Sequence, residues 1–278
     1  MAGFHGKKVP TTRVSIVWPF MLISCQREED PDDAVAPLVG RLDKWQPGST
    51  EPHQHRRHQL ISSFTGVLHL STAVGQWVVP PARAVLIEAG TEHSLMVKRP
   101  AEVGVLYARA DAYPMALESK VRVVGMSPLV RELFLACTRS AWDYQEGSNE
   151  SRLAAVLMDQ LELLDQAPSD LPLPSDKRAL KVVKMLSDDP SNREPLDVLA
   201  QRAGSSKRTI ERLFATEANM TFGAWRQRQR LIMAVEALAY GESVKTVAMD
   251  VGYESASSFV AAFRAMFGVT PARYFRTP

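Results

Sequence analysis

Hydrophobic residues in the region 41–110 come in short runs that are closely spaced along the chain. Glycines separate several of these runs, for example Gly66, Gly75 and Gly90. Short strands divided by such turns are typical of a β-sandwich or a β-barrel. The runs that we interpret as strands cover residues 59–64, 67–72, 76–79, 83–87 and 103–107. The pattern therefore predicts a β domain in the first half of the chain.

Beyond this region the hydrophobic residues recur at the spacing of helices. They form two sets, one with Leu129, Val130, Leu133, Phe134 and Cys137, the other with Leu153, Val156, Leu157, Leu161 and Leu164. Each set is the apolar face of an amphipathic helix. Two interpretations are open: the faces cap the β domain, or they join two copies of the chain in a homodimer.

A proline-rich segment, residues 167–175, divides the chain. It holds three prolines in nine residues, which excludes a regular helix and is typical of a semi-rigid linker. Helical patterns then continue to Phe275. We therefore expect an α+β chain with an N-terminal extension (1–40), a β-barrel domain (41–115), a helical region (116–166), the linker (167–175) and an all-α domain (176–278).

The composition is that of a folded protein, with 278 residues of which 45% are hydrophobic and 23% charged. Charge is distributed unevenly between the two halves. Residues 176–278 hold 16 Lys and Arg against 11 Asp and Glu, and the remaining residues hold 17 against 20. A basic half joined to an acidic half is expected when only one half contacts nucleic acid.

Two cysteines, Cys25 and Cys137, are too few for a disulfide framework and lack the spacing of a zinc site. This usage fits a reducing cytosol. The apolar stretch that ends at Cys25 resembles a lipoprotein signal only in part, because Pro19 interrupts it and it is too short to span a bilayer. We expect a cytoplasmic protein with no membrane partner.

Residues 196–214 carry the pattern of two helices joined by a tight turn. Leu199 and Ala200 fall on the first helix, Gly204 in the turn, and Ile210 and Phe214 on the second helix. The small Ala200 lets the second helix cross closely, and Gly204 permits a backbone turn that a side chain hinders. The pattern predicts a helix-turn-helix unit.

The same pattern recurs 48 residues further along the chain, with Val247, Ala248, Gly252, Phe259 and Phe263. The second glycine is one residue further from the next helix than in the first copy, so a longer turn is expected there. Two copies at matched offsets indicate a DNA-binding domain much more strongly than one copy does.

A predicted helix with Thr221 as N-cap and Gly241 at its end connects the two copies. A rigid connector is needed because recognition helices that enter successive major grooves lie about 34 Å apart. Arg226, Arg228 and Arg230 on this helix are expected to contribute to salt-dependent DNA binding.

The region 181–276 resembles the AraC/XylS family of transcription regulators. The match is nearly position for position at Val247, Ala248, Gly252, Tyr253, Phe259, Phe263, Phe267, Gly268, Val269, Thr270, Pro271 and Tyr274. The resemblance implies a regulator that binds double-stranded DNA through two helix-turn-helix units. RNA polymerase is a further possible partner.

Alignment to this family motif implies which residues of the first unit read DNA, namely Lys207, Arg208, Glu211 and Arg212. Arginine can hold guanine O6 and N7 with two bonds, and glutamate can accept from cytosine N4. For Arg212, a salt bridge within the protein is the alternative. The matching positions of the second unit are short and mostly apolar, so phosphate and methyl contacts are expected from Ala256, Ser257, Ser258, Val260 and Ala261.

His53, His55 and Gln59, followed by His93, resemble the two motifs of the cupin barrel family. In metal-binding cupins, two histidines and a carboxylate of the first motif join a histidine of the second. Here Gln59 stands at the carboxylate position and is a poor metal ligand. His58 is expected to point to the opposite face of a regular strand.

Three interpretations are open for His53, His55 and His93: a divalent metal site, a pocket that binds a small organic effector, or a relic of the barrel. A metal-dependent cupin enzyme is the rival class, but the sequence shows no paired carboxylates or nucleophile–base spacing. We therefore expect an effector-responsive regulator rather than an enzyme. The residues expected to line the effector pocket are His53, His55, Gln59, Phe64, Trp77, His93 and Tyr107.

Overall fold

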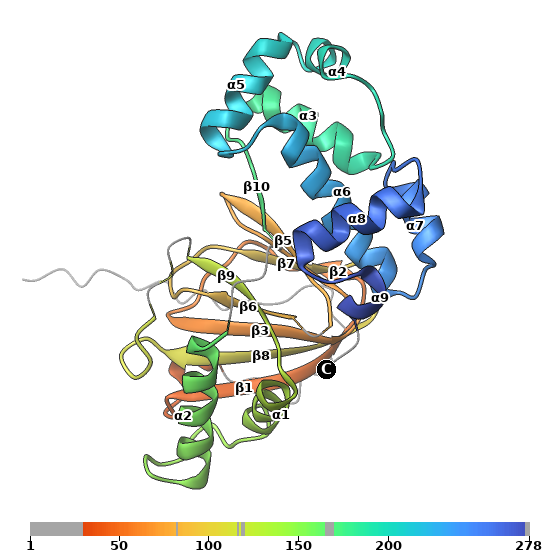
Figure 1. The fold of residues 1–278 in the computed structure, drawn as a ribbon. Coiled ribbons are helices and arrows are strands. Elements are labelled where there is room, and N and C mark those ends of the chain that lie inside the picture. Colours follow the sequence, from red (N-terminus) through yellow and green to blue (C-terminus); the bar gives the residue numbers. More distant parts are fainter. Residues whose placement is uncertain (1–29, 82, 116, 118–119, 165–169, 276–278) are drawn as a thin grey trace, which may run out of the picture.

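The computed structural model describes residues 30–81, 83–115, 117, 120–164 and 170–275. It has a β-rich N-terminal domain and a helical C-terminal domain (Figure 1). The strands are β1 (Leu38–Trp45), β2 (Gly48–Ser49), β3 (Arg57–Thr65), β4 (Leu68–Ser71), β5 (Gly75–Val79), β6 (Arg83–Ile87), β7 (Ser94–Val97), β8 (Ala101–Arg109), β9 (Val121–Gly125) and β10 (Asp170–Pro172). The helices are the short η1 (Pro31–Asp33), α1 (Pro128–Cys137), α2 (Asn149–Glu162), α3 (Lys177–Asp188), α4 (Leu196–Arg202), α5 (Lys207–Glu217), α6 (Phe222–Ala239), α7 (Val244–Asp250), α8 (Ala256–Phe267) and α9 (Pro271–Tyr274).

The strands form two antiparallel five-stranded sheets that face each other, rather than the expected closed barrel. Sheet A has the order β1-β8-β3-β6-β9 and sheet B the order β10-β5-β4-β7-β2. Alternate residues of each strand point into the space between the sheets. Gln59 lies opposite Tyr107 in the pairing of β3 with β8, and Ile61 lies opposite Val105. These residues share the face that carries the interior core, together with Trp45.

The apolar faces of α1 and α2 pack against the outer face of sheet A. Each helix begins at a serine N-cap, Ser127 and Ser148, whose hydroxyl accepts a backbone N–H of the first turn. Phe134 and Leu157 are fully buried in a second core on this side of the sheet, which also contains Leu106. Of the two interpretations open for these faces, capping of the β domain is therefore the one that the structure shows.

The expected linker is in part a strand. Residues 170–172 form β10, which extends the edge of sheet B by pairing with β5. The side chain of Leu171 is buried among residues of the C-terminal core, and Trp225 Nε1 donates to the Pro172 carbonyl over 2.7 Å. Three prolines exclude a helix here but leave carbonyl groups and the N–H of Leu173 available for sheet-edge bonding.

Other boundaries also differ from those expected. β1 starts at Leu38, ahead of the expected start of the β domain, and β9 lies where a helical region was expected. The structure also shows Cys137 buried in the core behind α1, and burial raises the pKa of its thiol to about 12. The lipoprotein-like stretch and Cys25 lie outside the described residues. No helix in the described part of the chain is long and apolar enough to cross a membrane.

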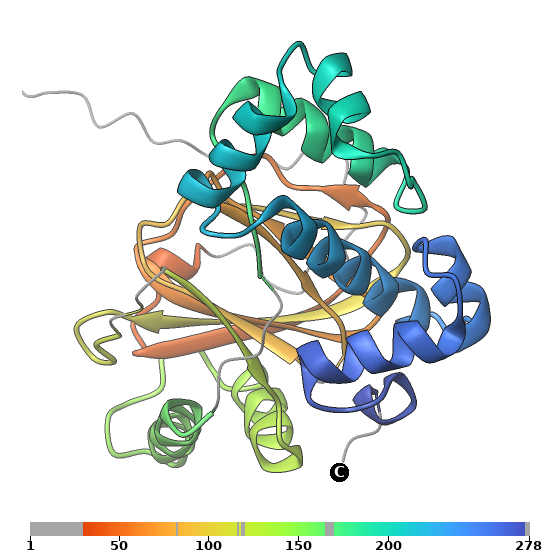
Figure 2. The same ribbon diagram turned by 45° about the horizontal axis from the view of Figure 1, so that its top comes forward.

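The C-terminal domain consists of two helical cores joined by α6. One core lies around α3, α4 and α5 and contains the fully buried Trp225 of α6. The other lies around α7, α8 and α9 and contains Val235, near the end of α6. Figure 2 shows α6 running past sheet B between the two sets of helices. α6 thus connects the two units and also packs against β5 and β10.

Candidate DNA interface and sensor interior

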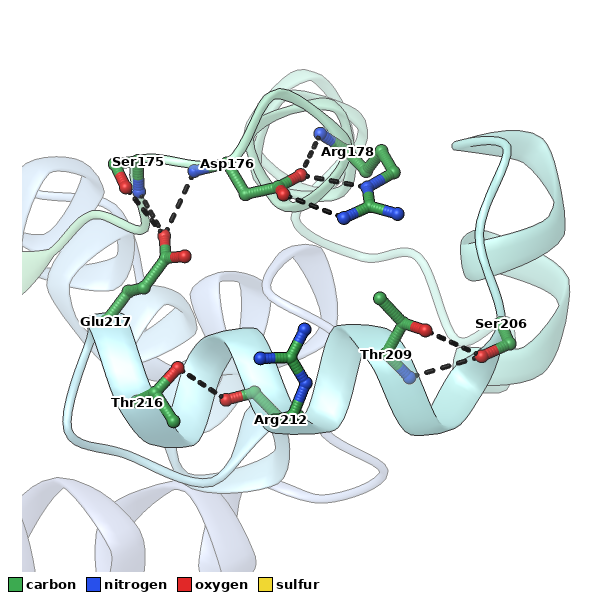
Figure 3. A network of polar contacts seen from close by, with 8 residues as sticks. All are labelled: Ser175, Asp176, Arg178, Ser206, Thr209, Arg212, Thr216 and Glu217. Atoms are coloured by element: carbon green, nitrogen blue, oxygen red, sulfur yellow. Dashed lines mark hydrogen bonds and ion pairs between the residues drawn. The ribbon is translucent and has the colours of Figure 1, made fainter.

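The first helix-turn-helix unit is formed by α4 and α5. Gly204 in the turn has a φ of +74°, and no atom lies within 4 Å of the position where a Cβ would stand. It is therefore the backbone conformation, and not a close neighbour, that favours glycine. Ser206 caps α5, and its Oγ accepts the N–H of Thr209 over 3.2 Å (Figure 3). The cap and the fully buried Ile210 fix which face of α5 points outward.

The outward face of α5 carries the four predicted reading residues. Lys207, Arg208, Glu211 and Arg212 are all exposed. Lys207 Nζ and Glu211 Oε1 form a loose ion pair of 4.0 Å between exposed side chains, which costs little to break. Among the described residues the Arg212 side chain makes no ion pair within 4 Å, whereas its carbonyl accepts from Thr216 (Figure 3). The alternative of an internal salt bridge for Arg212 is therefore not supported.

The second unit is formed by α7 and α8, and its turn of residues 251–255 is longer than the first turn of residues 203–206, as expected. The predicted positions on α8 line an open groove, formed by Ala256, Ser257, Val260, Ala261, Arg264, Ala265 and Thr270. The Ser258 hydroxyl donates to the Ser255 carbonyl within the cap of α8. Ser257 is exposed as well, and among the hydrogen bonds of the described residues its hydroxyl takes part in none. Arg264 is a groove residue that the sequence motif did not indicate.

Two of the three arginines expected to assist DNA binding turn into the domain instead. Arg226 donates to the carbonyls of Asn192 and Glu194, and Arg230 donates to those of Asn192 and Gly252. Both side chains are half-buried. The expectation that Arg226 and Arg230 contact DNA phosphates is therefore wrong. A guanidinium that donates to carbonyls inside the domain is not presented to DNA.

In the β domain, the three predicted histidines meet at one end of the space between the sheets. His53 and His93 exchange two backbone hydrogen bonds of 2.8–2.9 Å. Their ring centres lie 4.6 Å apart, and the ring of His55 lies 5.2 Å from His53 and 5.1 Å from Tyr107. Gln59 shares this face of β3 and hydrogen-bonds Tyr107. The structure thus brings together five of the seven residues that were expected to line the pocket.

Backbone carbonyls fix the tautomers of two of these histidines. Nδ1 of His53 lies 2.8 Å from the Glu51 carbonyl, and Nδ1 of His93 lies 2.9 Å from the Thr91 carbonyl. A carbonyl only accepts, so each Nδ1 carries the proton and each Nε2 carries a lone pair. Nε2 of the buried His93 has no hydrogen-bond partner among the described residues.

Burial keeps these imidazoles neutral. It lowers the pKa of His93 to about 4, although the bond to Thr91 opposes the shift. Burial also lowers the pKa of His53. At neutral pH this end of the interior therefore gains no positive charge from either ring.

The remaining expectations for this interior need correction or addition. Phe64 does not line it: its ring lies 5.4 Å from Phe134 in the core behind sheet A, because Phe64 is an odd number of residues from Gln59 and alternates to the other face. Trp77 belongs to the interior core. Arg41 and Asp43 of β1, paired at 3.1 Å, were missed, although their alternation with Val39 and Trp45 is visible in the sequence.

The metal interpretation is not supported. Across the described residues, no group of three or more His, Cys, Asp or Glu side chains is arranged to hold a metal ion. Nδ1 of His55 faces Asp32 at 3.6 Å, and Gln59 supplies no carboxylate. His58, the considered substitute, lies on the outer side of β3, where its Nδ1 accepts the N–H of Ala89.

Ion pairs and cation–π contacts join the β domain to the DNA-binding domain. Glu236 of α6 lies between His69 Nε2 at 3.1 Å and Lys98 Nζ at 2.7 Å. The guanidinium of Arg99 stacks 4.2 Å from the ring centre of Tyr240, and that of Arg83 lies 4.7 Å from the ring centre of Tyr274. Burial alone raises the pKa of Glu236, but His69 and Lys98 outweigh it and lower the pKa to about 2.

Known proteins similar to this chain were found by sequence and by structure. A family model described as a helix-turn-helix domain matches residues 199–277. The HTH-type transcriptional regulator NimR of Escherichia coli is 34% identical over 222 residues, which cover 80% of this chain and 81% of NimR. The regulatory protein SoxS of E. coli is 39% identical over 88 residues, or 31% of this chain and 79% of SoxS. A solved structure of ToxT from Vibrio cholerae with a bound unsaturated fatty acid covers 88% of this chain and 97% of that chain, at 12% identity and a TM-score of 0.37.

The two helix-turn-helix units and their exposed recognition helices define a DNA-binding transcriptional regulator. The chain belongs to the family of HTH-type transcriptional regulators of the AraC/XylS type, because the similarity to NimR extends over four fifths of both proteins.

Proposed function

We propose that the protein binds one operator in two segments, one for each helix-turn-helix unit, and that the β domain adjusts this binding when a small-molecule effector enters it. The observation that carries the proposal is the outward face of α5. Lys207, Arg208, Glu211 and Arg212 project there from a helix whose opposite face is fully packed. The proposed activity contains no enzymatic step. Its setting is the cytoplasm, where a bound regulator has RNA polymerase as its partner.

The two units divide the work of recognition. Arg208 and Arg212 have the donors for bidentate bonds to guanine, and Glu211 has the acceptor for cytosine N4. The groove on α8 offers methyl groups, the Ser257 hydroxyl and the charge of Arg264. Such groups suit a thymine methyl and the phosphate backbone. We therefore assign sequence selection to α5 and docking to α8.

The effector site is the histidine end of the sandwich interior. His53, His55, Gln59, His93 and Tyr107 converge there from β3, β8 and the segments that join at the His53–His93 bridge. The lone pair of His93 Nε2 is buried without a partner, and a buried acceptor gains about 1–3 kcal/mol when a donor satisfies it. Because burial lowers the pKa of His53 and His93 and keeps both rings neutral, the site favours an uncharged effector that donates hydrogen bonds.

The interface between the domains provides the route from effector to DNA. Sheet B holds α6 through β5 and β10, and Glu236 is held by His69 and Lys98. α6 connects the two helix-turn-helix units. A shift of sheet B would move α6 and so change how both recognition helices bind DNA. The effector acts only if it binds the two arrangements with different affinity.

A homodimer is also proposed. The buried faces of α1 and α2 pack on sheet A, but Leu129 of α1, Val156 of α2 and Leu163, the C-cap residue of α2, stay exposed by 54%, 46% and 75%. Exposed apolar side chains on two packed helices are suited to contact with a second copy. The dimer would bring two pairs of recognition helices to one operator region.

The test is selection of bound fragments from sheared genomic DNA, followed by affinity measurements on the selected duplex between 50 and 200 mM salt. Affinity is expected to fall steeply, by about 10³-fold or more if 6–10 phosphates are contacted. Arg208→Ala with Arg212→Ala should abolish selection, whereas Arg178→Ala with Lys184→Ala, an exposed basic pair on α3, should preserve it. Retention of no fragment over competitor, with and without cell extract, contradicts the proposal.

A further inference from the structure

Two arginines on one face of α6 converge on a single backbone carbonyl. Arg226 and Arg230 are one helical turn apart, so their side chains project from the same side of the helix. Nη2 of each donates to the carbonyl of Asn192, and the bond from Arg230 is 2.6 Å long. Asn192 lies in the segment between α3 and α4, which belongs to the first helix-turn-helix unit.

Arg230 also holds the second unit. Its Nη1 donates to the carbonyl of Gly252 over 3.3 Å, in the turn between α7 and α8. Arg193, which follows Asn192 in the first unit, reaches the same turn: its Nη2 donates to the Tyr253 carbonyl over 3.2 Å. The segment before α4 and the turn before α8 are therefore tied to each other through guanidinium groups as well as through α6.

The two turn glycines differ in a way that shows how closely this bridge is packed. A Cβ at Gly204 would meet nothing within 4 Å. A Cβ at Gly252 would lie 2.7 Å from Arg230 Nη2 and 3.1 Å from the Ser191 carbonyl. Glycine at 252 therefore serves the approach of Arg230 as well as the φ of +83°.

We propose that Arg230, assisted by Arg226, is a positioning residue that fixes the distance and angle between the two recognition helices and so sets the spacing of the two operator segments that the protein accepts. The planar guanidinium donates in fixed directions, which a lysine ammonium does not reproduce. Rotation of one unit relative to the other would break the bonds to Asn192 or Gly252. This inference rests on the proposed function, since it requires that both units read DNA.

The experiment uses the full chain and the operator selected by the wild-type protein. Duplexes with one or two base pairs inserted or removed between the two segments are compared with the parent duplex. For the wild-type protein each change rotates one segment about the DNA axis and is expected to lower affinity by about tenfold or more. Arg230→Lys, and to a lesser degree Arg226→Lys, should reduce this penalty to less than about threefold.

The control is Arg178→Lys, because Arg178 is an exposed arginine of the same domain whose bonds go to Asp176. It should keep the wild-type spacing penalty. Base preference within each segment should stay unchanged in all three variants, since none of these arginines lies on the outward face of α5. Arg226→Lys keeps the bonds of Arg230 and so provides a folded variant even if Arg230→Lys is destabilised.

A spacing penalty equal to that of the wild-type protein in both Arg230→Lys and Arg226→Lys overturns the inference, even if affinity or thermal stability falls. Failure of the wild-type protein to select any two-segment operator overturns the proposed function itself. The two failures are therefore distinguishable.

Discussion

Glu236 on α6 and His69 on β4 lie 3.1 Å apart across the boundary between the two domains. Lys98 approaches the other carboxylate oxygen to 2.7 Å, and the side chain of Glu236 is only 15% exposed. A carboxylate this buried must be compensated by partners, and here both partners come from the other domain. The β domain thus binds α6 through the Glu236 carboxylate, for which the DNA-binding domain alone provides no ion-pair partner among the described residues.

The first prediction concerns acid stability. The pKa of Glu236 is lowered from 4.5 to about 2, so between these values the unfolded chain binds more protons than the folded one. The stabilisation is present above about pH 4.5 and is lost as pH falls toward 2. Glu236→Gln should cost roughly 1–3 kcal/mol at pH 7 and flatten the loss of stability between pH 5 and 3.

Thermal unfolding across this pH range measures the effect. Glu242→Gln, at an exposed glutamate just beyond α6, is the control and should behave as the wild-type protein. An equally steep acid loss in Glu236→Gln would mean that the contact contributes nothing.

The second prediction is the asymmetry between recognition helices. Arg208→Ala removes a directional donor and should flatten preference at one base pair of one operator segment, at a cost of about 1–3 kcal/mol. Ser257→Ala should weaken binding to all sequences alike. Binding-site selection from random DNA with both variants measures preference directly. A consensus that shifts with Ser257→Ala and stays fixed with Arg208→Ala would reverse the assignment of roles.

The third prediction concerns the histidines. His55→Ala combined with His93→Ala removes two rings from the interior cluster and should abolish the response to effector, while DNA binding without effector stays within about threefold of the wild-type value. A reporter gene under the selected operator, induced with cell extract or candidate compounds, provides the measurement. His58→Ala, on the outer face of the same sheet, is the matched control. Unchanged induction in the double variant would remove these residues from the effector site.

The fourth prediction concerns self-association. Val156→Glu with Leu163→Glu should convert a dimer at micromolar concentration into a monomer, because each places a charge in the proposed apolar contact. Sedimentation measures the mass. Val74→Glu, at another exposed apolar position of the chain, should leave the dimer intact. A wild-type monomer both free and on DNA contradicts the proposal.

The sequence predicted the helical half well because the relevant signal is local. Ala200 and Gly204 were expected on the first helix and in the turn, and both are found there: Ala200 is buried on α4, and Gly204 has a positive φ. The cap of α5 by Ser206 was not predicted. The roles of Arg226 and Arg230 were not predictable in this way. Their acceptors are backbone carbonyls 22 to 38 residues away, and a carbonyl leaves no mark in a sequence.

In the β domain, the predicted direction of a side chain was correct where it followed the alternation of residues along the strand. It was wrong for Phe64, where this alternation was not considered. Gln59 and Tyr107 share a face because their strands pair in register, whereas Phe64 has the opposite parity and packs outside. The open sandwich was harder to foresee than its strands, since closure depends on pairings between strands distant in the sequence. β10 illustrates this, because its partner β5 precedes it by about a hundred residues.

Leu171 contributes its backbone to the sheet of one domain and its side chain to the core of the other. The two domains are therefore not exchangeable modules that meet at a hinge. A DNA-binding half that starts at residue 176 leaves β10 behind with the β domain, so it has a hole in its core where Leu171 packed, and Trp225 Nε1 loses its acceptor. Recombination that creates new regulators by swapping sensors would have to cross over before residue 170, so β10 is inherited with the DNA-binding half and must find a matching β5 in every new partner.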